Sequence, residues 1–174
     1  QALKYATSGM PIFPLLPGSK KPATPRGFKD ATTDAATVSA WWTQNPNANI
    51  GLPTGEASGL YVVDIDGPEG EDALKALEEK HGALPDTLIS KTGRGTHYIF
   101  KASEPIKNTA GALGPKIDTR GTGGYIVAPP SLHPNGERYR WERRTAPAEL
   151  PAWLRPAKRE PVQQPLRLAR VDSL

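Results

Sequence analysis

The sequence predicts an α/β fold of the α+β type, in which helices and largely antiparallel strands follow one another in mixed order. Residues 60–66 are apolar and β-branched except for two aspartates, as in a strand that is half buried. Residues 68–80 begin with Pro and acidic residues and carry leucines three apart, as in a helix. Residues 87–91 and 96–101 flank a turn with two glycines, as in a β-hairpin. A hairpin directly after a strand and a helix is typical of α+β domains.

The first third of the chain predicts two helices, two strands and a basic loop. Pro and Gly punctuate the loop, and Thr33 and Asp34 supply start signals for the second helix. In chain order these are a helix ending near Gly9, a strand at 12–16, the loop at 17–28, a helix at 35–42 and a strand at 49–52.

The rest of the chain predicts three more strands and then a tail. The strands lie at 116–119, 124–128 and 138–142, separated by turns with Gly, Pro and Asn. From residue 156 on, the composition is rich in Pro, Gln and Arg, which is typical of a linker. We therefore expect a folded domain over residues 1–154 and a linker over 155–174 toward a further region.

Composition restricts the function classes. The 174 residues carry a formal net charge of +4 and no Cys, so a disulfide framework and a Cys-based zinc module are both excluded. No apolar run approaches the roughly 20 residues that cross a bilayer. The N-terminus has no secretory pattern. We expect a soluble cytoplasmic protein with no membrane partner, and the positive charge suits an anionic one.

The strand at 60–66 carries the most informative pair of residues. Asp64 and Asp66 point to the same face because strand side chains alternate, and their Cα atoms lie roughly 6–7 Å apart. Two carboxylates at this separation suit one hard divalent cation. The alternative is an ordinary strand exit, in which one Asp accepts from turn amides and the other caps the next helix.

Two later positions extend this hypothesis. His97 follows a glycine-rich turn, where a His and basic side chains can hold phosphate oxygens; the alternative is a half-buried hairpin His. Asp118 faces away from Ile117 and offers a third carboxylate for a two-metal site. The alternative for Asp118 is the ordering of its own turn, together with Thr119 and Arg120.

Three further positions have more than one interpretation. Ser131 and His133 follow a Pro-Pro strand exit, and either line the site or form a structural elbow. Tyr139 shares a strand face with Trp141, and for both core packing is favoured over the alternative, stacking on nucleic-acid bases.

The order of these segments resembles the bifunctional DNA primase/polymerase (prim-pol) domain of the archaeo-eukaryotic primase superfamily, over about residues 3–154. The matching motifs are Gly18-Ser-Lys-Lys-Pro, Phe28-Lys-Asp-Ala-Thr-Thr, Asn49-Ile-Gly-Leu-Pro-Thr-Gly55, Val63-Asp-Ile-Asp-Gly67, Thr92-Gly-Arg-Gly-Thr-His97 and Ile117-Asp-Thr-Arg-Gly-Thr-Gly-Gly-Tyr-Ile-Val-Ala-Pro-Pro-Ser131. The resemblance implies a two-lobed fold with an RRM-like mixed or antiparallel sheet flanked by helices.

The resemblance also implies roles for the site residues. The catalytic divalent metals, Mg²⁺ or Mn²⁺, are expected on Asp64, Asp66 and Asp118, with His97 on the triphosphate of the incoming nucleotide. Further nucleotide contacts are expected from Arg94, Lys91, Thr96 and Ser131. One departure is Gly95, where relatives commonly have Ser. No zinc is expected, because the zinc-binding stem of some relatives needs Cys.

The expected partners follow from the same resemblance. They are a single-stranded DNA template with a primer, dNTPs or NTPs, and a helicase region downstream, in replication of a phage, plasmid or other mobile element in a prokaryotic host. Template and backbone phosphates are expected at Lys20, Lys21, Arg26, Arg143 and Arg144.

Two other functions compete with a nucleotidyltransferase. An Asp-nucleophile phosphatase has a similar acidic motif, but it needs alternating strands and helices and normally has Thr where Pro68 stands. A nucleic-acid-binding or nucleotide-binding module without catalysis needs no carboxylates, so the full set of three Asp and one His argues against it.

Overall fold

The computed structural model describes residues 1–157, and most of the predicted linker lies outside the described residues. No helix among these residues has the length and apolarity to cross a membrane. The helices are α1 (Ala2–Thr7), α2 (Ala35–Gln44) and α3 (Gly67–His81), with 3₁₀ turns η1 (Gly27–Asp30) and η2 (Ala152–Leu154). The strands are β1 (Phe13–Leu15), β2 (Asn49–Pro53), β3 (Leu60–Asp66), β4 (Leu88–Lys91), β5 (Gly95–Lys101), β6 (Thr109–Ala110), β7 (Ile117–Arg120), β8 (Tyr125–Ala128), β9 (Arg140–Arg143) and β10 (Ala148–Glu149).

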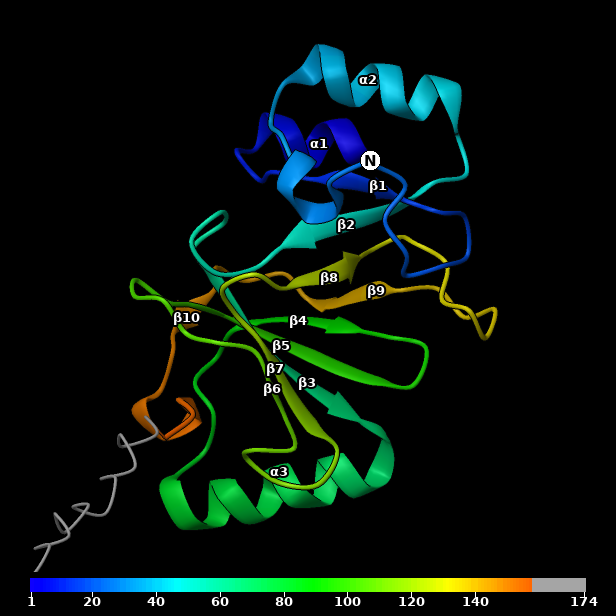
Figure 1. The fold of residues 1–174 in the computed structure, drawn as a ribbon. Coiled ribbons are helices and arrows are strands. Elements are labelled where there is room, and N and C mark those ends of the chain that lie inside the picture. The colour runs from blue at the N-terminus through cyan, green and yellow to red at the C-terminus, as the bar shows by residue number, and fades with distance from the viewer. Residues whose placement is uncertain (158–174) are drawn as a thin grey trace, which may run out of the picture.

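The strands form two sheets, and Figure 1 shows them as separate layers. The smaller sheet has the order β1-β2-β8, and the larger has the order β6-β7-β3-β5-β4-β9. All of these pairs are antiparallel, and only β10 joins β5 in parallel. The α+β fold class predicted from the sequence is therefore confirmed.

Strand β3 lies inside the larger sheet, and its two faces pack against different layers. Tyr61, Val63 and Ile65 are buried in a core with Leu74 of α3. Val62 lies on the other face, in a core that it shares with residues of the smaller sheet. This alternation is the one that the sequence predicted. It directs Asp64 and Asp66, which share a face with Val62, toward the space between the sheets and away from α3.

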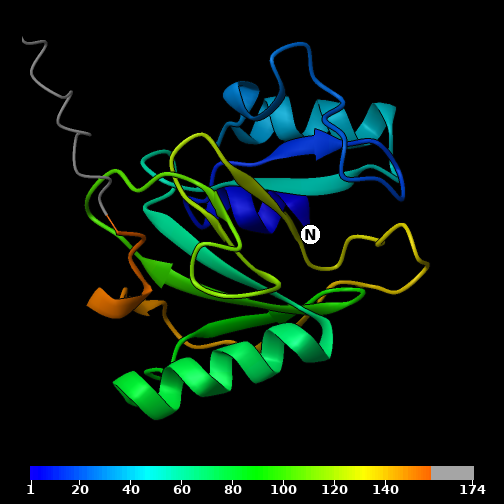
Figure 2. The same cartoon turned by 60° about the horizontal axis from the view of Figure 1, so that its bottom comes forward.

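Helix α3 covers the outer face of the larger sheet (Figure 2). The turn at its start has an acidic residue and Pro, and its last turn has Lys80 and His81, in the order that favours the helix dipole. His81 stacks on Trp153 with ring centroids 5.3 Å apart. The larger sheet thus has a helix on one face and the smaller sheet on the other.

The smaller sheet is held by close packing with the loops around it. The ring of Phe13 lies over Gly51, where an added Cβ would come within 2.5 Å of it. Helix α2 begins at Asp34, whose carboxylate accepts a hydrogen bond of 2.8 Å from the amide of Thr37. Figure 1 places α2 at the opposite end of the molecule from α3. The site lies between these two ends.

Candidate active site

Three neighbouring strands bring Asp118, Asp64 and His97 side by side. In the register of the larger sheet, Asp64 of β3 pairs with Asp118 of β7 on one side and with His97 of β5 on the other. Directly paired residues share a face, with Cα atoms about 4.5–5.5 Å apart. His97 Nε2 lies 3.5 Å from Asp64 Oδ1, and Ser90 Oγ lies 3.5 Å from the other ring nitrogen. Residues more than 50 positions apart in the sequence thus form one row.

Asp66 lies at the end of β3, opposite Gly95. Its carboxylate faces Arg94, with Asp66 Oδ2 and Arg94 Nη2 3.6 Å apart. A Cβ added to Gly95 would lie 1.8 Å from the carbonyl oxygen of Ile65. A serine therefore has no room at Gly95 without a backbone shift, which gives a steric reason for the departure at this position.

The three carboxylates each face a different basic group. Asp118 Oδ2 lies 3.5 Å from Arg120 Nη2, while its Oδ1 accepts from the amide of Gly111 at 3.1 Å. Among residues 1–157, no three His, Asp or Glu side chains lie close enough together to hold a metal ion. The backbone therefore collects the expected carboxylates on one face, but the rotamers do not assemble them as ligands. The donor set, three carboxylates, fits a hard divalent cation.

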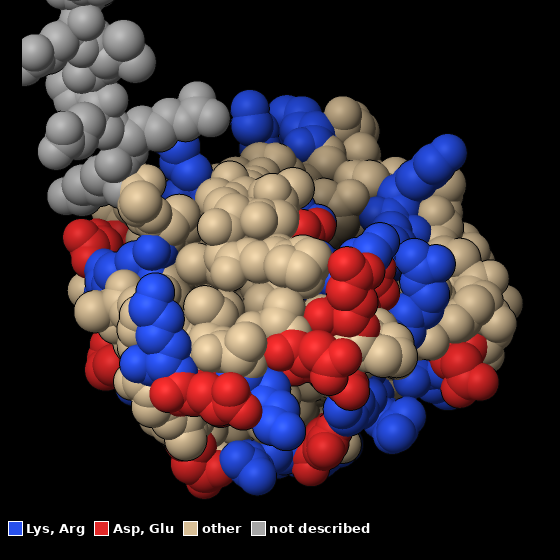
Figure 3. Space-filling model, turned by 90° about the horizontal axis from the view of Figure 1, so that it is seen from below, with Lys and Arg blue, Asp and Glu red and all other residues tan. Residues whose placement is uncertain are grey.

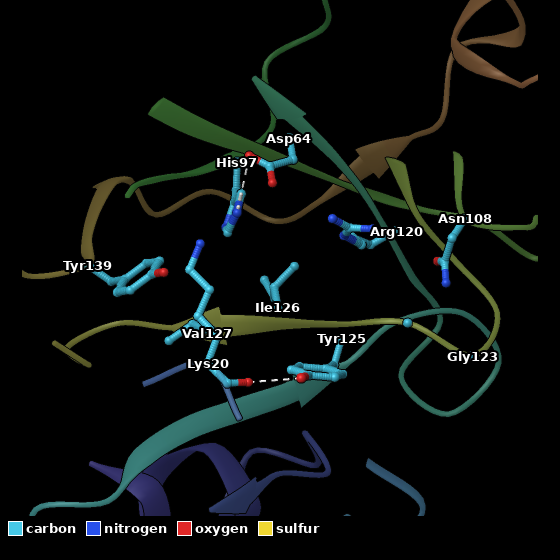
Figure 4. Close-up of a pocket in the computed structure, with 11 residues that line it drawn as sticks. Lys20, Asp64, His97, Asn108, Arg120, Gly123, Tyr125, Ile126, Val127 and Tyr139 are labelled. Atoms are coloured by element: carbon cyan, nitrogen blue, oxygen red, sulfur yellow. Dashed lines mark hydrogen bonds and ion pairs between the residues drawn. The ribbon is translucent and has the colours of Figure 1, made fainter. Parts of the chain in front are cut away.

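Two adjoining cavities of about 320 and 360 Å³ open over this row. One is otherwise lined by Asn108 and residues 123–127, and the other by charged side chains, among them Asp66, Arg94, Lys116 and Asp118. The residues common to both are Lys20, Asp64, His97, Arg120 and Tyr139. Figure 4 shows these five side chains around one space, with Asp64, His97 and Arg120 on strands of the larger sheet and Lys20 and Tyr139 on loop segments. The space fits a ligand with a highly charged part and a less charged part.

The electrostatics keep Asp64 ionised. Burial alone raises the pKa of Asp64, but the hydrogen bond with His97 and the charges of His97, Arg120 and Lys20 together hold it below the ordinary value. Lys20 belongs to the basic loop, which is tied to the smaller sheet because the hydroxyl of Tyr125 donates 2.8 Å to the Lys20 carbonyl oxygen. An ionised carboxylate beside a lysine suits both a cation and a phosphate.

Two aromatic residues of the segment between β8 and β9 form another wall. The ring of Tyr139 lies 6.3 Å from that of His97 and 5.6 Å from that of His133, between centroids. His133 Nδ1 accepts from the amide of Asn135 at 3.1 Å. Burial, with the charges of Lys20 and Arg94, lowers the pKa of His133. His133 thus lines the charged cavity as a neutral ring near pH 7.

The family comparison agrees with this geometry. Residues 2–153 match the model of a family described as bifunctional DNA primase/polymerase, N-terminal (Prim-Pol). The chain belongs to the Prim-Pol family. No curated protein matches the chain. Membership assigns the domain to a family of DNA primases and polymerases, as the resemblance in the sequence predicted.

The Prim-Pol cavities do not include two residues expected at the nucleotide. Lys91 pairs with Thr96, and Thr96 pairs with Ile65, whose side chain faces α3. Lys91 Nζ donates 2.8 Å to Thr96 Oγ1 and lies 3.3 Å from Glu142 Oε2. Lys91 and Thr96 thus lie on the face of the sheet opposite His97. Both residues lie next to the glycine-rich turn before His97, which is why the sequence placed them at the nucleotide. Strand side chains alternate between the two faces, however, so those of Lys91 and Thr96 point away from the cavities.

Ser131 also lies outside the two Prim-Pol cavities. Its hydroxyl is buried and accepts a hydrogen bond of 2.8 Å from the amide of Ile50. This is the structural elbow that the sequence left open as an alternative. The neighbouring His133 does line the charged cavity, so the two residues of this strand exit have separate roles.

Of the residues expected at DNA, the structure brings only Lys20 to the cavities. Lys21 is exposed on the same loop. Arg26 is paired with Asp30 at 2.7 Å. Arg143 forms an ion pair with Asp86, and Arg144 is exposed. Arg143 is the last residue of the edge strand β9 and Arg144 follows it, two strands away from the row of site residues.

Sequence reasoning did not include several lining residues in the Prim-Pol site. Arg120 shares a strand face with Asp118, so the period of two could have revealed it. Lys116 adopts a positive φ of 60°, which its residue type does not suggest. Asn108 lies in an exposed loop without a local signal. Tyr139 was assigned to the core, and the structure gives it a place in both the core and the cavity wall.

Proposed function

We propose that this domain transfers nucleotidyl groups from dNTPs or NTPs to the 3′-hydroxyl of a primer or initiating nucleotide on a single-stranded DNA template. The observation that carries the proposal is the row Asp118–Asp64–His97, which crosses three strands and faces a cavity lined by basic groups. Family membership supports the same reaction class. The biological setting would be replication of a phage, plasmid or other mobile element.

The carboxylates would hold the divalent metals. Asp64, Asp66 and Asp118 share one face of the sheet and are the residues that would bind Mg²⁺ or Mn²⁺ after turning from their basic neighbours. When bound, such ions activate an attacking hydroxyl and stabilise the pyrophosphate leaving group. The low pKa of Asp64 favours this role because the carboxylate needs no deprotonation near pH 7.

The basic side chains would hold the triphosphate. Arg94, Lys20 and His97 surround the charged cavity, and Arg120 lies at the junction with the second cavity. Charge-assisted hydrogen bonds from such groups are about twice as strong as neutral ones. In this arrangement, Arg94 and Arg120 would exchange a carboxylate for a phosphate when the nucleotide and metal enter.

The second cavity would take the nucleoside. Its wall includes Gly123, Gly124 and the following residues to 127, with Asn108 at its side. Glycines let a flat ring or a sugar approach the backbone closely. The template and primer would then lie over the exposed loop that carries Lys20 and Lys21.

Primer extension tests the proposal. Wild type is incubated with a primed single-stranded template, dNTPs and Mn²⁺ or Mg²⁺, beside the Asp64→Ala/Asp66→Ala double variant. We expect extension by wild type and its loss in the variant, with DNA affinity retained. A folded wild type that binds DNA but extends no primer would support the non-catalytic module instead. Release of phosphate without extension would support the phosphatase, although the antiparallel neighbours of β3 do not favour that fold.

A further inference from the structure

The ring of Tyr139 is buried, but its hydroxyl is not enclosed by the protein, because no enclosed side-chain N or O atom in residues 1–157 lacks a hydrogen-bond partner. The residue is only 2% exposed, and its ring packs in a core with Phe13, Leu15 and Val127. No other group in residues 1–157 forms a hydrogen bond with the hydroxyl, whereas Tyr5 and Tyr125 each donate to a carbonyl oxygen. Buried tyrosines usually find such a partner. The packing of the ring therefore does not account for the hydroxyl.

The hydroxyl faces the cavity. Figure 4 shows it pointing into the space below His97 and beside Lys20. Tyr139 lines both cavities, so the hydroxyl lies at their junction. A ligand that fills both cavities would cover this point, and the hydroxyl would then need a partner on the ligand.

The surroundings indicate what that partner is. Lys20 and His97 line the cavities beside the hydroxyl as donors, together with the carboxylate of Asp64, and His133 borders the ring on the other side. Burial and the charge of Asp64 raise the pKa of Tyr139, so the phenol keeps its proton and can only be used as a donor or neutral acceptor. With Asp64 on a metal ion, as in the proposed function, the donors that remain suit an acceptor-rich group, and a phosphate offers acceptors alone.

We propose that the Tyr139 hydroxyl donates a hydrogen bond to a phosphate oxygen of the incoming nucleotide, at the junction of the two cavities. The inference rests on the proposed function, because it takes a nucleoside triphosphate as the ligand. It adds Tyr139 to the binding residues, separate from the carboxylates and from His97. The ring of Tyr139 packs in the hydrophobic core, and its hydroxyl contacts the ligand.

The test is the Tyr139→Phe variant, which keeps the ring and removes one oxygen. Calorimetric titration with a dNTP and with inorganic triphosphate, each in Mg²⁺, gives the affinities. We expect both ligands to bind about tenfold more weakly, as for a lost hydrogen bond to a charged group. The melting temperature should not fall, because the hydroxyl has no partner in the protein. Tyr98→Phe is the matched control, since Tyr98 packs in the α3-side core of the same sheet and should leave both affinities unchanged.

Each other outcome is decisive. Equal affinities for wild type and Tyr139→Phe would overturn the inference. Weaker binding of the dNTP alone, with triphosphate unaffected, would also overturn it and assign the hydroxyl to the sugar or base. A wild type that binds neither ligand would refute the proposed function and the inference with it. The wild-type titration tests the proposed function, and the comparison with the variant tests the role of Tyr139. A failure of the proposed function can therefore be distinguished from a failure of the inference about Tyr139.

Discussion

At the scale of single residues, the site depends on which charges lie next to Asp64. Its lowered pKa results from His97, Arg120 and Lys20, which together outweigh the effect of burial. A carboxyl group whose pKa is lower in the folded state stabilises that state above its unfolded pKa. This contribution is lost as the pH falls through the folded pKa.

The stability of Asp64→Asn should therefore depend less on pH. Between about pH 5 and pH 3, the native wild type binds fewer protons at this position than the unfolded chain does, so its free energy of unfolding falls with falling pH. Asparagine does not titrate, so it removes the contribution of this position to the change of unfolding free energy with pH. Urea unfolding at the two pH values measures it. Equal slopes for the two proteins would show that the neighbours of Asp64 do not lower its pKa.

Gly95 is required by the contact between β5 and β3. An alanine would place its Cβ 1.8 Å from the carbonyl oxygen of Ile65, so the strands must separate locally. We expect Gly95→Ala to lower the free energy of unfolding by about 1–3 kcal/mol. Thermal and urea unfolding measure the loss. In the control Gly114→Ala, the nearest contacts are 3.5 Å, and the change should stay within about 0.5 kcal/mol. Similar losses in both variants would contradict the steric explanation.

Most of the candidate metal-binding and nucleotide-binding residues could be predicted from the sequence, and most of their neighbours in the cavities could not. Asp64, Asp66, Asp118 and His97 lie in recognisable motifs, and the structure gathers them at one cavity. The lining residue Asn108 comes from an exposed loop whose path is set by long-range contacts, such as its bond to the amide of Gly121. Contacts between residues far apart in the chain cannot be predicted from the local sequence pattern.

At the scale of elements, the register of the strands decides which basic residues face the cavities. Arg94 lies in the turn beside Asp66, whereas Lys91 lies on the α3 face. We expect Arg94→Ala to raise the KM for a dNTP roughly tenfold, because it loses a hydrogen bond to a charged group. Lys91→Ala should change it less than about twofold, since its partners are Thr96 and Glu142. Steady-state primer extension measures both. A larger effect at Lys91 would contradict the register of β4 and β5.

The longer helices and strands were predicted from the sequence, and the shortest strands were not. Strand β3 and helix α3 have strong periodic patterns, and both were predicted to within about two residues. Strands β6 and β10 have two residues each and exist only through pairing with β7 and β5. A two-residue strand has no periodicity, so it is visible only when its partner is known.

At the scale of the whole molecule, the face around α3 carries charges of both signs. Figure 3 views the molecule from the α3 side, where acidic and basic side chains are interspersed without a continuous basic surface. Helix α3 itself carries Glu69, Glu71, Asp72, Glu78 and Glu79. The basic loop of Lys20 and Lys21 belongs instead to the lobe across the cavity. We therefore expect the template on the cavity side and away from α3.

DNA binding should weaken with salt. The logarithm of the affinity for single-stranded DNA is expected to fall linearly with the logarithm of salt concentration, by about 0.7 per neutralised phosphate. Lys21→Ala should reduce the slope by about that amount, whereas Lys75→Ala, on α3, should leave it unchanged. Fluorescence anisotropy at several salt concentrations measures the slopes. An affinity that is indifferent to salt would refute the assignment of this loop to DNA.

The central claim is that carboxylates of β3 and β7 act together in nucleotidyl transfer. The most direct measurement compares primer extension by wild type and by Asp118→Asn. This substitution replaces one carboxylate oxygen by an amide nitrogen on β7, and leaves Asp64 and Asp66 of β3 unchanged. We predict that the variant keeps its fold and its affinity for DNA but loses extension, as the Asp64→Ala/Asp66→Ala variant does. Extension by Asp118→Asn at the wild-type rate would contradict the claim.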